Sequence, residues 1–208
     1  ADGFQQVFTI PDKVSFGDGN QLKHEGESYT LKSDFFPAKW SANSSASGQT
    51  VFVNYGITAP ELEHNDYRKL KARKLKDKIF VMDIGTPDGI HPHSKYIKYH
   101  DLAERIELAR DKGAKGVVLV NLTGKANDLS PDFKKIHSRQ LPVIFVNDRE
   151  LASRLKEKSS LSFTTEIKAN RIITSNVVGL KNNGASTTII IGAHYDHLGL
   201  GGEGSLFA

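Results

Sequence analysis

The sequence contains no cysteine, which excludes disulfide bonds and thiolate metal ligands. No stretch reaches the roughly 18 consecutive apolar residues that a membrane-spanning helix needs. The motif Gly-x-Ser-x-Gly is also missing, which argues against a serine hydrolase of that type. What remains, 38% hydrophobic and 25% charged residues in a chain of 208, is typical of a globular protein with one large domain or two small ones.

The chain has a formal net charge of +4, and its basic residues are concentrated between Arg68 and Lys78. This segment has no interleaved aromatic residues on which nucleic-acid bases could stack. We therefore interpret it as a solvated face or loop and expect no nucleic-acid partner. The first residues, Ala1-Asp2-Gly3, lack an initiator methionine, so we expect that a signal peptide has been removed.

The middle of the chain predicts a compact α/β module. Short apolar runs bounded by turn residues predict buried strands at 78–82, 117–120 and 143–146. Apolar residues recur at helical spacing from Tyr99 to Lys112, and Gly113 stands where a glycine ends a helix. A second helix is predicted over 149–158, and residues 159–162 are expected to lead out of the module.

The N-terminal part is rich in strand and turn signals. Residues 4–10 alternate apolar and polar side chains, which predicts a strand that Pro11 closes. Further strands are predicted over 29–36 and 50–55, separated by a polar loop at 41–48.

The C-terminal part predicts a β-hairpin that leads into a histidine motif. The segments 176–180 and 187–191 read as strands, and Asn182-Asn183-Gly184 favours the positive φ angles of a tight turn. His194 and Asp196 follow and are two residues apart, so their side chains leave an extended backbone on the same face. Such a pair is typical of a metal ligand and the carboxylate that orients it.

The eight residues Gly192-Ala193-His194-Tyr195-Asp196-His197-Leu198-Gly199 resemble the first zinc-binding motif of the M28 family of co-catalytic zinc aminopeptidases. The resemblance implies that His194 binds zinc and that Asp196 orients it. His197 has no ligand role in that pattern. The implied cofactor is zinc, with two ions in a complete enzyme, and the implied substrate is a peptide with a free N-terminus.

The segments 78–82, 109–120 and 141–146 resemble successive elements of a protease-associated (PA) domain, which many secreted M28 enzymes carry. The implied fold class is α/β, with a PA-like module inserted into the start of a zinc-peptidase domain. We expect the N-terminal strand of the peptidase domain at 1–19, the PA-like domain at 20–165 and the start of the incomplete peptidase domain at 166–208. The resemblance also implies a periplasmic or secreted location, because many M28 enzymes with a PA domain are secreted.

The resemblance places the remaining zinc ligands and the general base of such an enzyme after Ala208. The chain is therefore expected to be a fragment that is inactive by itself, since one histidine cannot hold a metal and accept a proton. The alternative function is a non-catalytic PA-type module that binds a peptide or protein. Truncation of the sheet also predicts self-association through residues near 172–200.

Three weaker signals are assigned no function. Residues 199–204 fit Gly-x-Gly-x-x-Gly, but no helix can follow to face a nucleotide. His91 and His93 are interpreted as exposed loop residues and not as a metal pair. The remaining isolated histidines are expected at the surface, namely His24, His64, His100 and His137.

Overall fold

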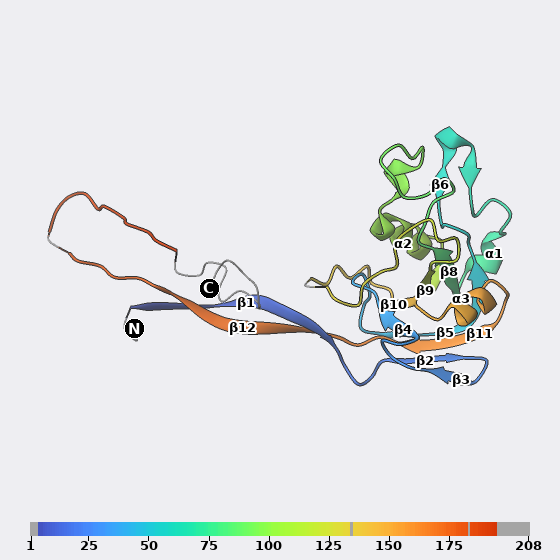
Figure 1. Ribbon diagram of the computed structural model, residues 1–208, viewed down its shortest axis with the longest axis horizontal. Helices are drawn as coiled ribbons and strands as arrows, with labels where there is room; N and C mark the ends of the chain where they lie inside the picture. The colour runs from blue at the N-terminus through green and yellow to red at the C-terminus, as the bar shows by residue number, and fades with distance from the viewer. Residues whose placement is uncertain (1–3, 134, 183, 195–208) are drawn as a thin grey trace, which may run out of the picture. The chain divides into compact units, whose positions relative to one another are not determined.

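The computed structural model describes residues 4–133, 135–182 and 184–194. The chain forms two compact units, Thr9–Thr174 and the pair of segments Ala1–Phe8 and Ser175–Ala208. Figure 1 shows the larger unit as a sheet with short helices packed against it. This confirms the predicted α/β class for that unit.

The larger unit is built on an eight-stranded sheet with the order β3-β2-β11-β5-β8-β9-β10-β4. Neighbouring strands in the run β5-β8-β9-β10 are parallel, and the flanking pairs are antiparallel. The bounds are β2 Gln21–His24, β3 Glu27–Tyr29, β4 Phe35–Pro37, β5 Ser45–Phe52, β8 Lys78–Asp83, β9 Ala114–Val120, β10 Val143–Val146 and β11 Ser160–Thr164. The predicted strands at 78–82, 117–120 and 143–146 are thus confirmed.

The remaining elements are short. The helices are α1 Ala72–Leu75, α2 Leu102–Asp111 and α3 Arg149–Arg154, with 3₁₀ turns η1 Pro60–Leu62 and η2 Ile97–Tyr99. Strands β6 Thr58–Ala59 and β7 His64–Asn65 pair with each other, as do β1 Gln5–Phe16 and β12 Ile167–Val177.

Helix α2 matches its prediction except at its start. The Asp101 carboxylate accepts a hydrogen bond of 2.8 Å from the Ala103 amide, which caps the helix and sets its first turn. Gly113 has a φ of +90°, the left-handed conformation that ends helices. The predicted helix over 149–158 is shorter than expected, because α3 ends at Arg154.

Both faces of the central strands are buried, which explains their continuous apolar sequences. Along β8, Phe80 and Met82 belong to a core cluster that includes Ile106 of α2. Ile79 and Val81 belong to a second cluster, which includes Leu151 of α3. Because successive side chains of a strand point to opposite faces, the two helices cover opposite faces of the sheet.

A buried carboxylate lies at the carboxyl end of β8. The Asp83 side chain is 1% exposed and accepts hydrogen bonds from the amides of Gly85 (2.7 Å), Leu122 (2.8 Å) and Thr123 (2.9 Å). The hydroxyl of Thr123 donates a further bond of 3.1 Å. One side chain thus holds the turn after β8 against the turn after β9.

A buried guanidinium lies beside it. Arg105 of α2 donates to four carbonyl oxygens, those of Tyr55 (3.0 Å), Asp83 (3.3 Å), Ile84 (2.7 Å) and Gly85 (2.8 Å). Burial lowers the pKa of Arg105 to about 10, and the nearby Asp83 charge opposes that shift. Arg105 therefore remains charged at neutral pH and is neutralised by Asp83 and by backbone dipoles.

Hydrogen bonds join the segment before β2 to the segment after β11. The side-chain amide of Asn20 donates to the carbonyls of Gly17 (2.7 Å) and Glu166 (2.8 Å), and its oxygen accepts from the backbone amide of Glu166 (2.8 Å). The Glu166 carboxylate accepts a bond of 2.8 Å from the amide of Gly19. The Glu166 carboxyl group occupies the space that a Cβ at Gly17 would need, so a larger residue there would displace this side chain.

Several predicted boundaries are wrong. The strand predicted over 29–36 is interrupted, because β3 ends at Tyr29 and β4 begins only at Phe35. Between them the Asp34 carboxylate accepts a hydrogen bond of 2.6 Å from the Thr30 amide and closes a turn. Strand β5 begins at Ser45, inside the predicted loop 41–48. Strand β11 pairs with both β2 and β5, so residues 159–162 lie inside the sheet and do not lead out of the module.

The prediction that Pro11 closes the first strand is also wrong. Strand β1 continues through Pro11 to Phe16. Among the described residues it pairs with β12 alone, so each of its residues needs a hydrogen-bond partner on one side at most. A proline, which lacks an amide hydrogen, is tolerated in such an edge strand.

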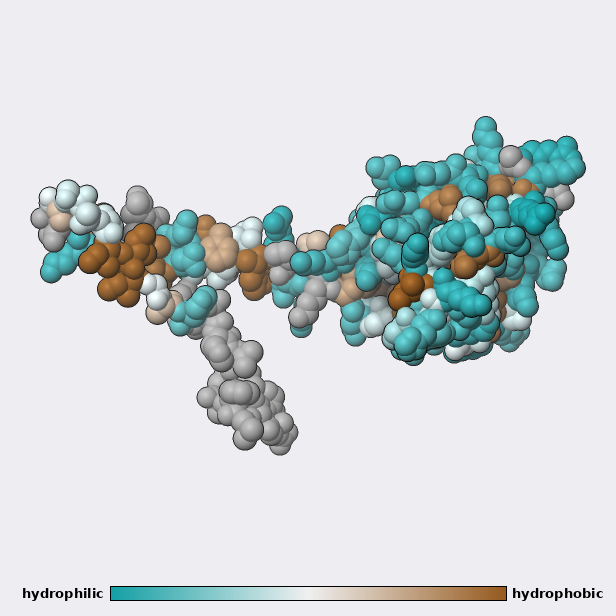
Figure 2. All heavy atoms as spheres, turned by 90° about the horizontal axis from the view of Figure 1, so that it is seen from above, coloured by the Kyte–Doolittle hydropathy of each residue, from teal (hydrophilic) through white to brown (hydrophobic). Residues whose placement is uncertain are grey.

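The predicted C-terminal hairpin is wrong in the described residues. Strand β12 ends at Val177, and no strand is present in 178–182 and 184–194. The side chains of Ile189, Ile190 and Ile191 are 86%, 89% and 91% exposed. Apolar residues of this kind form a strand only where neighbouring strands supply hydrogen bonds and cover, and none does so here. Figure 2 shows hydrophobic side chains gathered along the smaller unit.

No helix in the described part of the chain is long and apolar enough to cross a bilayer.

We predict that Asp83→Asn lowers the free energy of unfolding by about 2–4 kcal/mol, because an amide group would face buried donors and leave Arg105 without its counter-charge. Urea unfolding followed by fluorescence measures this change. Asp132→Asn is the matched control, since Asp132 is exposed and its substitution should change stability by less than about 0.5 kcal/mol. Equal stability of the two variants would contradict the structural role of Asp83.

The prediction that His24 lies at the surface is wrong, since this β2 residue is 2% exposed. Neither ring nitrogen has a hydrogen-bond partner among the described residues. Burial, followed by the positive charge of Arg154, lowers the pKa of His24 below 6.5. The unfolded chain therefore binds a proton more readily than the folded one, and stability falls as the pH drops below 6.5.

We predict that His24→Leu reduces the loss of unfolding free energy between pH 7.5 and pH 5.5. One proton accounts for at most about 1.4 kcal/mol per pH unit. Urea titrations at the two pH values test this, with the exposed His137→Leu as control. A pH dependence that is the same in both variants would show that His24 does not titrate with folding.

Candidate functional site

The predicted zinc motif lies at the end of the described chain. His194 is exposed, and its predicted partner Asp196 lies outside the described residues, as does His197. Among residues 4–133, 135–182 and 184–194, no three histidine or acidic side chains come together as a metal site would require. The described residues therefore do not form a zinc centre.

The other histidines are distributed as follows. His91, His93 and His137 are exposed, as predicted. His64 and His100 are half-buried, and the His64 Nε2 atom lies 3.1 Å from an Asp66 carboxylate oxygen. The His91 Nε2 atom lies 3.1 Å from the backbone oxygen of Asp88, within its own loop.

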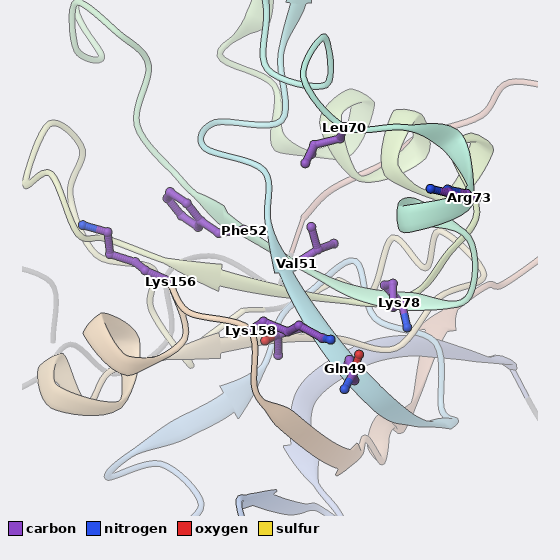
Figure 3. A pocket seen from close by; sticks show the side chains of 9 residues that line it. Gln49, Val51, Phe52, Leu70, Arg73, Lys78, Lys156 and Lys158 are labelled. Atoms are coloured by element: carbon purple, nitrogen blue, oxygen red, sulfur yellow. The ribbon is translucent and has the colours of Figure 1, made fainter.

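A basic groove of about 680 Å³ lies on the larger unit and is the principal candidate site (Figure 3). Its cationic side chains are Arg73, Lys78, Lys156 and Lys158. No acidic side chain of the described chain lines it. We call this cavity the basic groove.

Three different parts of the sequence build the basic groove. Strand β5 runs through its floor, with Leu70 and Arg73 on one side and Lys156 and Lys158 on the other (Figure 3). The two lysines come from the segment between α3 and β11. The sheet order brings this segment to β5, because β11 pairs with β5.

The floor of the groove is apolar. Val51, Phe52 and Leu70 line it, and each is half-buried. Val51 and Leu70 also pack against one core cluster, and Phe52 packs against the other. A ligand in the groove would therefore meet apolar side chains that pack against the core, together with the cationic side chains that line the same cavity.

The floor also contains an open sheet edge. The Thr50 amide donates to Ser159 at 2.9 Å, away from β8, whereas the Val53 amide donates to Val81 of β8 at 2.9 Å. Backbone groups alternate in direction along a strand, so the amide and carbonyl of Phe52 point away from β8. No described residue pairs with them, because β11 begins at Ser160, beside Gln49.

Sequence reasoning found only half of this site. It identified the basic segment 68–78 but assigned it to a solvated face. It gave no role to Lys156 and Lys158, which are about 80 residues further along the chain. No local pattern links the two segments, and only the pairing of β5 with β11 brings them together.

Two other cavities of the described chain are smaller and are lined by fewer cationic side chains. One of about 160 Å³ lies beside Phe36 and Trp40, and one of about 180 Å³ lies beside Tyr99 and Arg105. In the second of these cavities, Arg105 is already engaged by the four carbonyl oxygens described above.

The sequence has no match among curated proteins. Among solved structures, it is similar to an aminopeptidase from Aneurinibacillus sp. strain AM-1, with 18% identity and a TM-score of 0.48, over 82% of this chain and 37% of that one. A zinc aminopeptidase from Bacillus subtilis gives 18% identity and a TM-score of 0.46, over 82% and 34%. A peptidase M28 precursor from Shewanella amazonensis gives 17% and 0.39, over 84% and 40%. The chain spans between a third and two fifths of these proteins.

A match to a protein family covers the unit that carries the basic groove. Residues 42–154, which are 113 of the 208, match the PA domain family. The matched segment contains strands β5, β8, β9 and β10 with all three helices. It also contains Arg73 and Lys78, and it ends just before Lys156. The chain belongs to the PA domain family.

Proposed function

We propose that this chain is the PA-containing part of a zinc-dependent aminopeptidase that removes N-terminal residues from peptides. The observation that carries the proposal is the order of two features along one chain. A PA domain at 42–154 is followed by the motif at 192–199, which resembles the first zinc-binding motif of M28 aminopeptidases. In this proposal His194 is one zinc ligand and Asp196 is the carboxylate that orients it.

The described residues cannot perform that reaction alone. Hydrolysis at a zinc pair requires several ligands and a general base, and the described residues do not bring such a set together. We therefore propose that the 208 residues are inactive by themselves and that the activity belongs to a longer protein. The resemblance to M28 aminopeptidases also leads us to propose a periplasmic or secreted location.

We propose a domain organisation in which residues 20–165 are an insertion between 1–19 and 166–208 of the peptidase domain. The tie between Asn20 and Glu166 supports these limits. It holds Asn20, the first residue of the insertion, beside Glu166, the residue that follows its last, as an insertion into another domain requires.

The second candidate function is a non-catalytic module that binds a peptide or protein. The basic groove favours it, because an apolar floor with an open strand edge is suited to a polypeptide. The two functions are compatible, since a PA domain could recruit a polypeptide to a peptidase.

We predict that the whole protein binds about two zinc ions, as two-metal peptidases do, and loses affinity when His194 becomes Ala. Asp196→Asn should weaken zinc binding by about 10–100-fold, because the ligand histidine would lose its orienting carboxylate. Metal content after dialysis and release of N-terminal residues from peptides are the two measurements.

The control for this experiment is His137→Ala, which replaces an exposed histidine far along the chain from the motif. It should leave both zinc content and hydrolysis unchanged. If the whole protein binds no zinc, His194 has a structural role and the binding function is the one to pursue.

We predict that the 208-residue chain self-associates through residues near 172–200. Five large apolar side chains of this region are at least 75% exposed, namely Ile173, Leu180 and Ile189–Ile191. Their burial between two copies would remove apolar surface from contact with water, which is favourable. Light scattering at rising concentration should show dimers or larger species. Ile190→Lys should shift them toward monomer, whereas Lys181→Gln, an exposed polar change in the same segment, should not. A monomer at every concentration would contradict this prediction.

A further inference from the structure

We propose that the basic groove binds an extended acidic segment of a polypeptide, which adds as a short strand to the edge of β5 at Phe52. This inference rests on the second proposed function, peptide binding by the PA domain, and gives it a site and a ligand class. It does not depend on zinc or on His194.

The charge of the groove selects an acidic ligand. Arg73, Lys156 and Lys158 are exposed and Lys78 is half-buried, and all four line the same cavity. Positive charges that line one cavity repel one another, and an acidic ligand relieves that repulsion as it binds. Asp77 precedes Lys78 in the sequence and Glu157 lies between Lys156 and Lys158, but neither acidic residue lines the groove.

The backbone of the groove selects an extended polypeptide. The Phe52 amide and carbonyl face away from β8 and have no partner among the described residues. A peptide strand lying there would accept from this amide and donate to this carbonyl. Such an edge offers two hydrogen bonds that another class of acidic molecule, such as a nucleic acid, could not both make with the same geometry.

The floor and the rim together predict the pattern of the ligand. Side chains of an extended strand alternate between two faces. One set would rest on Val51 and Leu70, and the other would reach Lys156 and Lys158. The preferred segment therefore alternates acidic and aliphatic residues, as in acetyl-Glu-Leu-Glu-Val-Glu-amide.

The first experiment measures fluorescence anisotropy of this labelled peptide with the 208-residue chain at low salt. We expect saturable binding that weakens as salt rises, because exposed charges are screened over about 10 Å at 0.1 M salt. The isosteric peptide with Gln in place of each Glu should bind at least about tenfold more weakly. If the Gln peptide binds equally well, the acidic preference is wrong, although peptide binding itself still stands.

The second experiment places the peptide in the groove. Lys156→Gln with Lys158→Gln should weaken binding by about 3–10-fold, since each exposed ion pair is worth up to about 1 kcal/mol. The matched control is Lys23→Gln with Lys115→Gln, two exposed lysines on β2 and β9 that do not line the groove. An equal loss in both double variants would show that net charge, and not the groove, causes binding.

The third experiment tests the strand edge without any change to the protein. A peptide N-methylated at its central Glu keeps all side chains but cannot donate that amide to Phe52. We expect its affinity to fall by at least about fivefold, and unchanged affinity would overturn the backbone pairing.

Competition with a single-stranded oligonucleotide tests whether the ligand of the groove is a nucleic acid and not a polypeptide. If the oligonucleotide displaces the peptide and binds more tightly with the same dependence on Lys156 and Lys158, the occupant is nucleic acid and the inference is overturned.

Discussion

The larger unit depends on the buried pair formed by Asp83 and Arg105. Each charge is removed from water, and each is stabilised mainly by backbone groups: amides for the carboxylate and carbonyls for the guanidinium. Such an arrangement is costly to disturb, because removing one partner leaves the other charge buried without compensation. The pair therefore fixes the turns at the carboxyl ends of β8 and β9 relative to α2.

Arg105 also restrains the backbone next to the basic groove. Arg105 donates to the carbonyl of Tyr55, three residues after β5 ends at Phe52. The segment after β5 is therefore held against the ends of β8 and α2 and cannot fold back over the edge of β5. On the other side, Thr50 is bound to Ser159, and the pairing of β5 with β11 does not extend beyond this point toward Phe52. Phe52 therefore lies between two hydrogen-bonded positions of the backbone, and its amide stays open.

The sequence predicted those parts of the fold that depend on local patterns. Strands β8 and β10 are continuous apolar runs because both their faces are buried, and α2 carries an apolar repeat and a terminal glycine that can each be recognised. The cap at Asp101 was not recognised, so the start of α2 was misplaced. The groove could not be predicted, because it depends on which strands are neighbours. His24 was misplaced for the same reason, since a four-residue strand with alternating burial carries too few residues to show which face is covered. The predicted hairpin failed because an apolar run specifies burial but not the strand that provides it.

The two units also differ in what they require from other molecules. The larger unit buries most of its large apolar side chains in two clusters on its own sheet and helices, so its stability depends mainly on contacts inside the chain. Ile189, Ile190 and Ile191, in contrast, remain in water, although burying each would contribute about 1.5–3 kcal/mol. Among the described residues none covers these three side chains, so that stabilisation requires further polypeptide, such as a second copy of the chain. The basic groove, in contrast, is formed entirely by described residues of the larger unit.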